Sequence, residues 1–287
     1  MRVPYARLSR AELDRQLSPS RSAKDFESVL SRHAAKTAAL AGATDLAHWS
    51  DVAFGPGARQ RYDVTAPRTG AKRPCLVFIH GGFWQEGSKQ WSGFAARAYA
   101  QAGWAHVGVG YTLAPEAGLE QIVDEVAAAL RHLRGHAADY GIDPDRIVLA
   151  GHSAGAHLVA AILAGLGGDD LPGALAGYVL ISGVYDLAPV AASYVNEAVG
   201  LTPGEVERLS PLLYWPAADR PVHLVVGADE PEAFGRQSDA LAALWGRKLR
   251  RISLARCPGR DHFDVLDELG REGSETWDRI QRMGQGG

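Results

Sequence analysis

The stretch Arg146-Ile-Val-Leu-Ala-Gly-His-Ser-Ala-Gly155 decides the fold. Its first half is a short apolar run typical of a buried strand, and the helix-forming run Ala154–Leu166 follows its second half. Between them lies the pattern G-x-S-x-G, in which a serine on a sharp strand-to-helix turn holds its hydroxyl clear of the backbone. Small residues on either side let strand and helix pass closely. This setting predicts that Ser153 is a nucleophile.

Runs that resemble strands and helices alternate on both sides of this turn. Such alternation is typical of βαβ units, and it predicts an α/β fold with a mostly parallel central sheet and helices on both faces. Together with the nucleophile turn, it predicts the α/β-hydrolase fold. The expected strands are Cys75–Ile79, Trp104–Val109, Arg146–Ala150, Tyr178–Ser182, Val222–Val226 and Leu249–Leu254. The expected helices are Lys89–Ala102, Leu119–Ala138, Ala154–Leu166 and Ala233–Leu244.

The first fifty residues are rich in helix formers, in two runs separated by Pro19. We therefore expect an N-terminal helical extension over residues 1–50 and an α/β-hydrolase domain over residues 51–287. The extension could pack on the main domain as a structural element, or it could cap the active site, and the sequence leaves both readings open.

Composition narrows the classes of partner. A net charge of −3 and a pI near 6.4 give no reason to expect nucleic acid. No apolar stretch is long enough for a transmembrane helix, and the N-terminus lacks the apolar core of a secretory signal. The two cysteines, Cys75 and Cys257, are isolated. We expect a cytoplasmic protein that acts on a small molecule, and a homodimer remains open.

A glycine-rich turn follows the strand expected at Cys75–Ile79. It reads His80-Gly81-Gly82-Phe83-Trp84. Glycines let the backbone approach a substrate, so that N–H groups can stabilise the oxygen of a tetrahedral intermediate. The expected donors of this oxyanion hole are the N–H groups of Gly82, Phe83 and Ala154. We interpret His80 as a brace for the loop and not as a base.

Two further residues complete the catalytic set in the order nucleophile, acid, histidine. Asp229 follows the strand expected at Val222–Val226, and His262 lies in the loop after the next strand. Because parallel strands end at one edge of the sheet, both side chains should lie near Ser153. We assign His262 as the base and Asp229 as the acid that orients it. The competing carboxylates are Glu230, Asp186 and Asp261.

The remaining histidines favour no metal site. His132 and His136 are four residues apart on an expected helix, but no third ligand is evident. His157, on the helix after the nucleophile, is expected to pack or to form a hydrogen bond. We therefore predict neither a metal nor another cofactor.

The chain resembles the kynurenine formamidases, or arylformamidases, within the α/β hydrolases. The resemblance rests on HGGFW at 80–84 with Gln85, GHSAGAH at 151–157, SGVYDLAP at 182–189, VVGADEP at 225–231 and DHFDVL at 261–266. It implies metal-independent hydrolysis of an N-formyl aryl amide, such as N-formyl-L-kynurenine, with release of formate. It also implies Ser153, Asp229 and His262 as the triad and the 80–84 loop as the oxyanion side. Trp84 and Tyr185 would lie near the acyl and aryl pockets.

Two other functions stay open. One is a carboxylesterase for short acyl esters, resembling the hormone-sensitive-lipase group. The other is a binding protein that keeps the pocket but has lost catalysis, against which the intact serine, acid and histidine argue.

Overall fold

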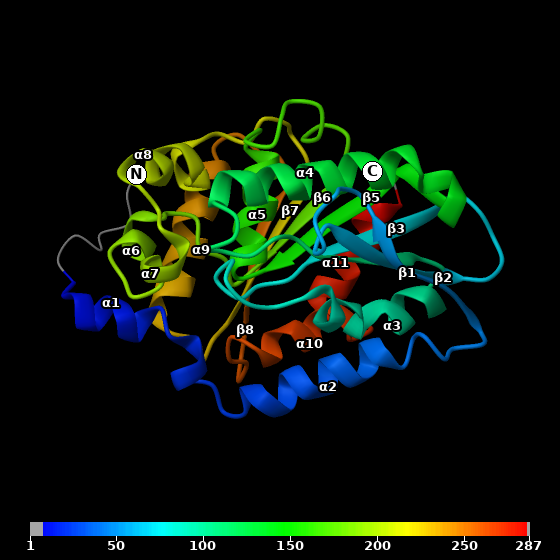
Figure 1. Cartoon of the computed structure of the whole chain (residues 1–287), viewed down its shortest axis with the longest axis horizontal. Helices are drawn as coiled ribbons and strands as arrows, with labels where there is room; N and C mark the ends of the chain where they lie inside the picture. Colours follow the sequence, from blue (N-terminus) through cyan, green and yellow to red (C-terminus); the bar gives the residue numbers. More distant parts are fainter. Residues whose placement is uncertain (1–7, 286–287) are drawn as a thin grey trace.

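The computed structural model describes residues 8–285, and one sheet of eight strands forms its centre (Figure 1). The strand order is β1-β2-β4-β3-β5-β6-β7-β8. The pairs β1·β2 and β2·β4 are antiparallel, and the other neighbours are parallel. The predicted α/β-hydrolase fold is confirmed. The strands are β1 (Leu46–Ala53), β2 (Arg61–Pro67), β3 (Arg73–Ile79), β4 (Ala105–Val109), β5 (Ile142–His152), β6 (Gly177–Ile181), β7 (Val222–Gly227) and β8 (Ile252–Cys257).

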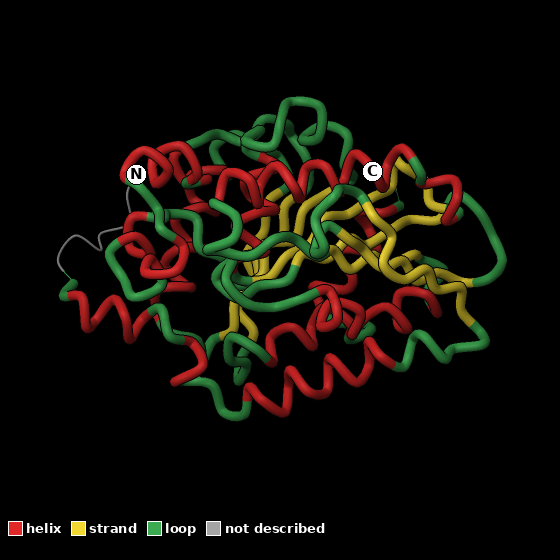
Figure 2. The backbone as a smooth tube through the Cα atoms, viewed as in Figure 1, coloured by secondary structure: helices red, strands yellow, loops and turns green. Residues whose placement is uncertain are grey.

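Helices cover both faces of the sheet, as the tube in Figure 2 shows. One face packs against α4 (Leu119–Gly135), α5 (Ala154–Leu163) and α9 (Glu232–Trp245). The other packs against α3 (Ala96–Gln101), α10 (Asp267–Gly270) and α11 (Glu275–Gly284). Short helices fill the connections: α6 (Ala188–Ala191), α7 (Asn196–Val199), α8 (Pro203–Leu209) and 3₁₀ turns at Lys89–Ala95, Ala137–Tyr140, Pro211–Leu213 and Asp264–Leu266.

The alternation of side chains along β3 explains why this strand is apolar throughout. Val77 and Ile79 pack in the layer that contains α4 and α5, whereas Leu76 and Phe78 pack in the layer that contains α3 and α11. Successive side chains of a strand point to opposite faces, so a strand covered on both sides needs apolar residues at every position. β3 pairs in parallel with β4 and β5, which fixes where the glycine-rich turn and Ser153 emerge.

The sequence did not reveal β1 and β2. β1 begins at Leu46 and crosses residue 50, where the extension was expected to end. The strand is only partly buried and carries a register shift between Trp49 and Val52, which weakens its hydrophobic pattern. The helix expected at Lys89–Ala102 is also divided, into a 3₁₀ turn and α3.

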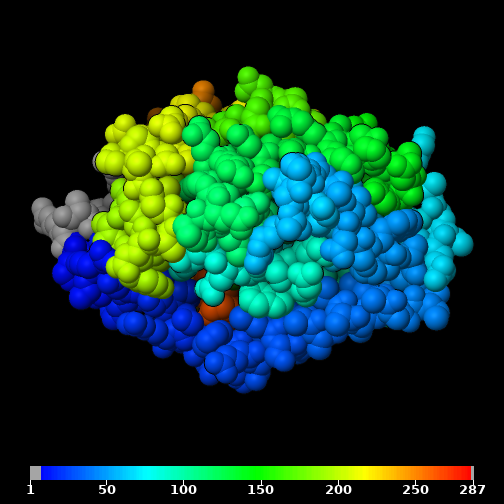
Figure 3. Space-filling view, viewed as in Figure 1, coloured from blue at the N-terminus to red at the C-terminus, as the bar shows by residue number. Residues whose placement is uncertain are grey.

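The N-terminal segment consists of α1 (Arg10–Gln16), a 3₁₀ turn at Pro19–Arg21 and α2 (Phe26–Ala38). Residues 1–7 of the expected extension lie outside the described residues. The segment, blue in Figure 3, lies along one side of the domain and meets the residues after β6. There the N–H of Tyr194 donates to Asp14 at 2.8 Å, and Arg10 pairs with Glu197 at 2.8 Å. No helix in residues 8–285 is long and apolar enough to cross a membrane.

Candidate active site

Ser153 occupies the strained turn between β5 and α5. Its backbone has φ 54° and ψ −117°, a conformation that non-glycine residues rarely adopt. Its N–H donates to the carbonyl of Ile181 at 2.8 Å, which anchors the turn to β6. A Cβ at Gly155 would collide with the backbone of Ile79 and His80, so only glycine allows α5 to pass this close to β3. The surrounding backbone thereby fixes the serine at the carboxyl end of β5.

The glycine-rich turn lies directly against Ser153. A Cβ at Gly81 would lie 3.0 Å from the Cβ of Ser153, and Gly82 has φ 106°. Among the described residues, the N–H groups of Gly82, Phe83 and Ala154 donate to no protein acceptor. Ala154 is the first residue of α5, where N–H groups are free because the helix has not yet formed its own bonds. Two of these donors, at Gly82 and Phe83, belong to residues that line one cavity with Ser153, and the third belongs to the residue that follows it. Unused N–H groups beside a serine are what an oxyanion hole requires.

His80 is buried under this turn. Its Nδ1 lies 2.8 Å from the carbonyl oxygen of Gly81, and its ring stacks on Tyr111 with centroids 4.3 Å apart. The Tyr111 hydroxyl donates to the carbonyl of His80 at 2.9 Å. Burial lowers the pKa of His80 to about 4, so the ring is neutral at pH 7. These contacts hold the loop in shape and are those of a brace.

The carboxylate that contacts His262 is Glu230, which corrects the assignment of Asp229. Nδ1 of His262 lies 2.7 Å from Oε2 of Glu230, and the two side chains are 3% and 1% exposed. Oε1 of Glu230 accepts from the N–H of Gly227 at 2.6 Å and from the Ser182 hydroxyl. A buried carboxylate held by two donors and a histidine is rigid, as the orienting acid of a triad should be.

Asp229 points the other way, toward the N-terminal segment. Its Oδ2 lies 2.8 Å from Nζ of Lys24, and its side chain is 42% exposed. The turn after β7 explains the difference between the neighbours, because the N–H of Asp229 donates to Arg260 at 2.9 Å and fixes the direction of the backbone. Ser182 follows β6, the neighbour of β7, and its hydroxyl donates to Glu230 and not to Asp229.

The other candidate carboxylates do not contact His262 either. Asp186 accepts from the N–H of Ala188 at 3.0 Å. Asp261 accepts from the N–H groups of Lys24, Phe263 and Asp264 at 2.9, 2.9 and 3.1 Å. Burial opposes the ionisation of Asp261, but these three donors outweigh it and lower the pKa of its carboxyl. Asp261 thus shapes the turn that carries His262.

A cavity of about 290 Å³ opens above Ser153 and His262. Six of its lining residues are aromatic. Trp84 and Tyr185, expected near the pockets, do not line it, because both are fully buried behind the site. Trp84 packs edge-on against His157, with ring centroids 5.0 Å apart. The aromatic lining is Phe26, Phe78, Phe83, Trp91, Tyr194 and Phe263.

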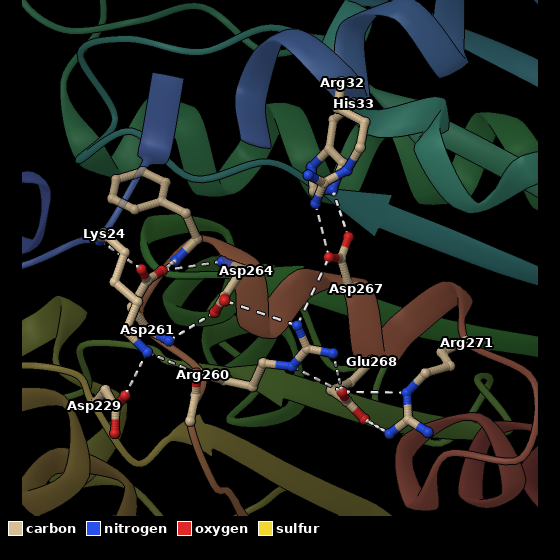
Figure 4. A network of polar contacts seen from close by, with 12 residues as sticks. Lys24, Arg32, His33, Asp229, Arg260, Asp261, Asp264, Asp267, Glu268 and Arg271 are labelled. Carbon is tan, nitrogen blue, oxygen red and sulfur yellow. Dashed lines mark hydrogen bonds and ion pairs between the residues drawn. The ribbon is translucent and has the colours of Figure 1, made fainter. Parts of the chain in front are cut away.

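The N-terminal segment supplies one wall of this cavity. Pro19, Ser20, Phe26, Leu30 and His33 all line it. Polar contacts hold this wall onto the loop that carries His262 (Figure 4). The sequence left open whether the extension only packs on the domain or also covers the candidate site. Its five lining residues support contact with the site.

Lys24 is the centre of that attachment. Its N–H donates to Asp261 at 2.9 Å, and its Nζ donates to Asp229 at 2.8 Å and to the carbonyl of Gly259 at 3.1 Å. Further along α2, His33 and Arg32 contact Asp267 at 3.1 and 2.7 Å. Lys24 therefore contacts the residues that directly precede Glu230 and His262 in the chain.

The histidine pair on α4 has other partners. Nδ1 of His132 lies 2.9 Å from the Tyr62 hydroxyl, and Nδ1 of His136 lies 2.9 Å from the carbonyl of His132. Within residues 8–285, no group of three or more His, Cys, Asp or Glu side chains could hold a metal ion. His157, also singled out by the sequence, lies 2.7 Å from the carbonyl oxygen of Leu209 through its Nε2.

Comparisons with known proteins show which family the chain belongs to. A model of the α/β hydrolase fold matches residues 76–251. Kynurenine formamidase of Salmo salar is 30% identical over 284 residues, which cover 91% of this chain and 92% of that protein. Esterase LipQ of Mycobacterium tuberculosis is 30% identical over 248 residues, covering 76% of this chain and 58% of that protein.

Solved structures of similar proteins have the same fold. A proposed thioesterase from Silicibacter sp. TM1040 superposes with a TM-score of 0.84 at 27% identity, covering 94% of this chain and 99% of that chain. Esterase B of Lactobacillus rhamnosis shares the fold, with a TM-score of 0.70 at 22% identity over 90% of this chain and 95% of that chain. The chain is a hydrolase, and it belongs to the kynurenine formamidase family of the α/β hydrolases.

Proposed function

We propose that this protein is a serine hydrolase that cleaves N-formyl aryl amides, such as N-formyl-L-kynurenine, to an arylamine and formate. The observation that carries the proposal is the contact of His262 with the buried Glu230 beside a cavity that Ser153 also lines. The similarity to the kynurenine formamidase of Salmo salar along nearly the whole chain supports the choice of substrate.

In the proposed reaction, Nε2 of His262 accepts the proton of Ser153 while Oγ forms a bond to the formyl carbon. The Nδ1–H of the ring remains bonded to Glu230, which fixes the tautomer and stabilises the imidazolium. The oxygen of the tetrahedral intermediate accepts hydrogen bonds from the N–H groups around the glycine-rich turn. His262 then gives its proton to the amide nitrogen, the C–N bond breaks, and the arylamine leaves.

Water completes the cycle by the same steps. His262 takes a proton from water, the hydroxyl attacks the formyl carbon of the serine ester, and Oγ leaves with the returned proton as formate is released. An arylamine is a better leaving group than an alkylamine because its nitrogen lone pair is delocalised into the ring. The same site should therefore also cleave activated esters.

The lining of the cavity fits a small acyl group and a large leaving group. A formyl carbon carries only hydrogen, and the bulky Phe83 lines the cavity next to Gly82. The aromatic walls formed by Phe26 and Phe263 can cover a ring, which contributes about 25 cal/mol per Å² of apolar surface buried.

A carboxylesterase for short acyl esters is the second candidate, favoured by the similarity to esterase LipQ. The deciding experiment compares kcat/KM for N-formylkynurenine with kcat/KM for p-nitrophenyl formate, acetate, butyrate and hexanoate. We expect turnover of the formamide and the highest corrected rate with formyl or acetyl. An optimum at butyryl without formamide turnover would establish the esterase. Ser153→Ala is the control, and it should lower either activity about 10⁴-fold or more.

A further inference from the structure

One side chain brings a fixed charge to the cavity beside Ser153. Among the described residues that line it, Glu86 is the single Asp, Glu, Lys or Arg. Burial keeps two of the lining histidines neutral, since it lowers the pKa of His80 to about 4 and the pKa of His152 well below its ordinary value. No cation in residues 8–285 forms an ion pair with Glu86. Apart from His33 and His262, which contact Asp267 and Glu230, the one charged side chain of the described lining is therefore an anion.

The position of Glu86 is set by the oxyanion loop itself. Its N–H donates to the carbonyl of Gly82 at 3.0 Å, which closes the turn. A Cβ at Gly82 would lie 2.9 Å from Cγ of Glu86, so the stem of the glutamate rests against the oxyanion backbone. Arg59, the cation attached to this loop, donates to the carbonyl of Gly87 at 3.2 Å instead of to the carboxylate.

A carboxylate at this position has a cost for catalysis. The tetrahedral intermediate carries a negative oxygen, and a nearby anion opposes that charge. A substrate that brings its own cation would cancel the repulsion and gain a charge-assisted hydrogen bond. The aromatic walls add to this, because the faces of rings such as Trp91 and Phe26 attract a cation.

We propose that Glu86 determines specificity by binding an ammonium group on the leaving portion of the substrate. A formyl group has no room for a charged substituent, so the ammonium must be attached to the aryl side. The proposal rests on the function proposed above and adds to it a residue that determines specificity.

A matched pair of esters isolates the charge. We would measure kcat/KM at low ionic strength for 4-(2-aminoethyl)phenyl acetate and for 4-ethylphenyl acetate, which differ in the ammonium group. The wild type should prefer the amine by up to about 5-fold, the upper range for an exposed ion pair. Glu86→Gln should reduce the ratio of the two kcat/KM values to about one, mainly by lowering kcat/KM for the amine-bearing ester. High salt should weaken the preference of the wild type and leave Glu86→Gln unchanged.

Glu272→Gln is the matched control, because Glu272 is exposed, lies outside the cavity lining and loses the same charge. It should keep the wild-type ratio. The proposal is overturned if the wild type shows no preference for the amine or if Glu86→Gln retains that preference. The same comparison with 2′-formamidopropiophenone and its 3-amino derivative tests formamides. Turnover of the esters with a Glu86-dependent ratio but of neither formamide would refute the formamidase alone, and turnover of both formamides without a ratio would refute the role of Glu86 alone.

A binding measurement tests the proposal even if the protein hydrolyses all four compounds slowly. We would titrate 2-phenylethylammonium into Ser153→Ala and into the double variant with Glu86→Gln, using calorimetry. Binding should be weaker in the double variant, by up to about 5-fold. Equal affinity would contradict the proposal.

Discussion

The carboxylate of Glu230 lies 2.7 Å from Nδ1 of His262, while the adjacent Asp229 lies 2.8 Å from Nζ of Lys24. Two consecutive acids thus serve different partners on opposite sides of one turn. The first pair is buried and the second is exposed to solvent. Because an ion pair in solvent contributes little and a buried one is costly to break, the two acids should respond very differently to substitution.

We expect Glu230→Gln to lower kcat by about 10³–10⁴-fold, since the amide cannot stabilise the imidazolium or select its tautomer. Asp229→Asn should change kcat by less than about 3-fold, because it removes an exposed ion pair. The measurement is kcat with phenyl acetate, with thermal unfolding as the control for folding. If Asp229→Asn lost more kcat than Glu230→Gln, the orienting acid would be Asp229 and not Glu230.

Gly82→Ala should lower kcat strongly by distorting the oxyanion turn. The backbone has φ 106°, and the new Cβ would collide with the carbonyl of Glu86. Displacing one oxyanion donor costs about 2.7–4 kcal/mol in the barrier, or about 10²–10³-fold in kcat. Gly103→Ala is the control, because Gly103 has φ 83° with nothing within 4 Å. It should lower stability and leave kcat unchanged, whereas equal losses of kcat would point to unfolding.

Lys24→Ala should weaken the attachment of the N-terminal wall without breaking the fold. The variant keeps the backbone bond to Asp261 but loses the Nζ contacts with Asp229 and Gly259. The exposure of the pair limits the expected loss in kcat/KM to about 2–5-fold, and Lys24→Arg should recover most of it. Arg97→Ala, which breaks an exposed ion pair with Asp45 outside the cavity, should leave kcat/KM unaltered. Equal kcat/KM values for Lys24→Ala and Arg97→Ala would show that the Nζ contacts of Lys24 do not support the cavity wall.

His106 should make the folded state sensitive to acid. Burial lowers the pKa of this β4 residue to about 3. Between the ordinary histidine pKa and this value, the unfolded chain binds a proton that the folded chain does not, so stability falls as pH falls. The slope is about 1.4 kcal/mol per pH unit for one such proton. Urea unfolding of the wild type and His106→Phe from pH 7 to pH 4 should show a shallower decline in the variant, and parallel curves would contradict this.

The parts of the site that depend on local chemistry could be predicted from the sequence. The turn at Ser153 needs small residues at fixed positions, and the loop at Gly82 needs a glycine, so both are visible as motifs. The choice between Asp229 and Glu230 is not local. It depends on which way one turn faces, and that direction is set by a backbone bond to Arg260, a residue of the following loop.

The two missed strands and the misplaced aromatic residues have a related cause. β1 is half-exposed at an edge of the sheet, so its pattern gives no clear period. Trp84 and Tyr185 lie within motifs, but a motif does not say whether a large side chain faces the cavity or the core. The left-handed backbone of Trp84, with φ 59°, accompanies a side chain that is fully buried.

The bond between Lys24 and Asp261 joins residues 237 positions apart. During synthesis at about 5–20 residues per second, roughly ten to fifty seconds separate these residues at the ribosome. Throughout that interval Phe26 has no Phe263 to pack against, although the two rings finally lie 5.2 Å apart. The segment around Lys24 therefore finds its place long after it has been made, and the cavity gains its outer wall only once the loop that carries His262 has been synthesised.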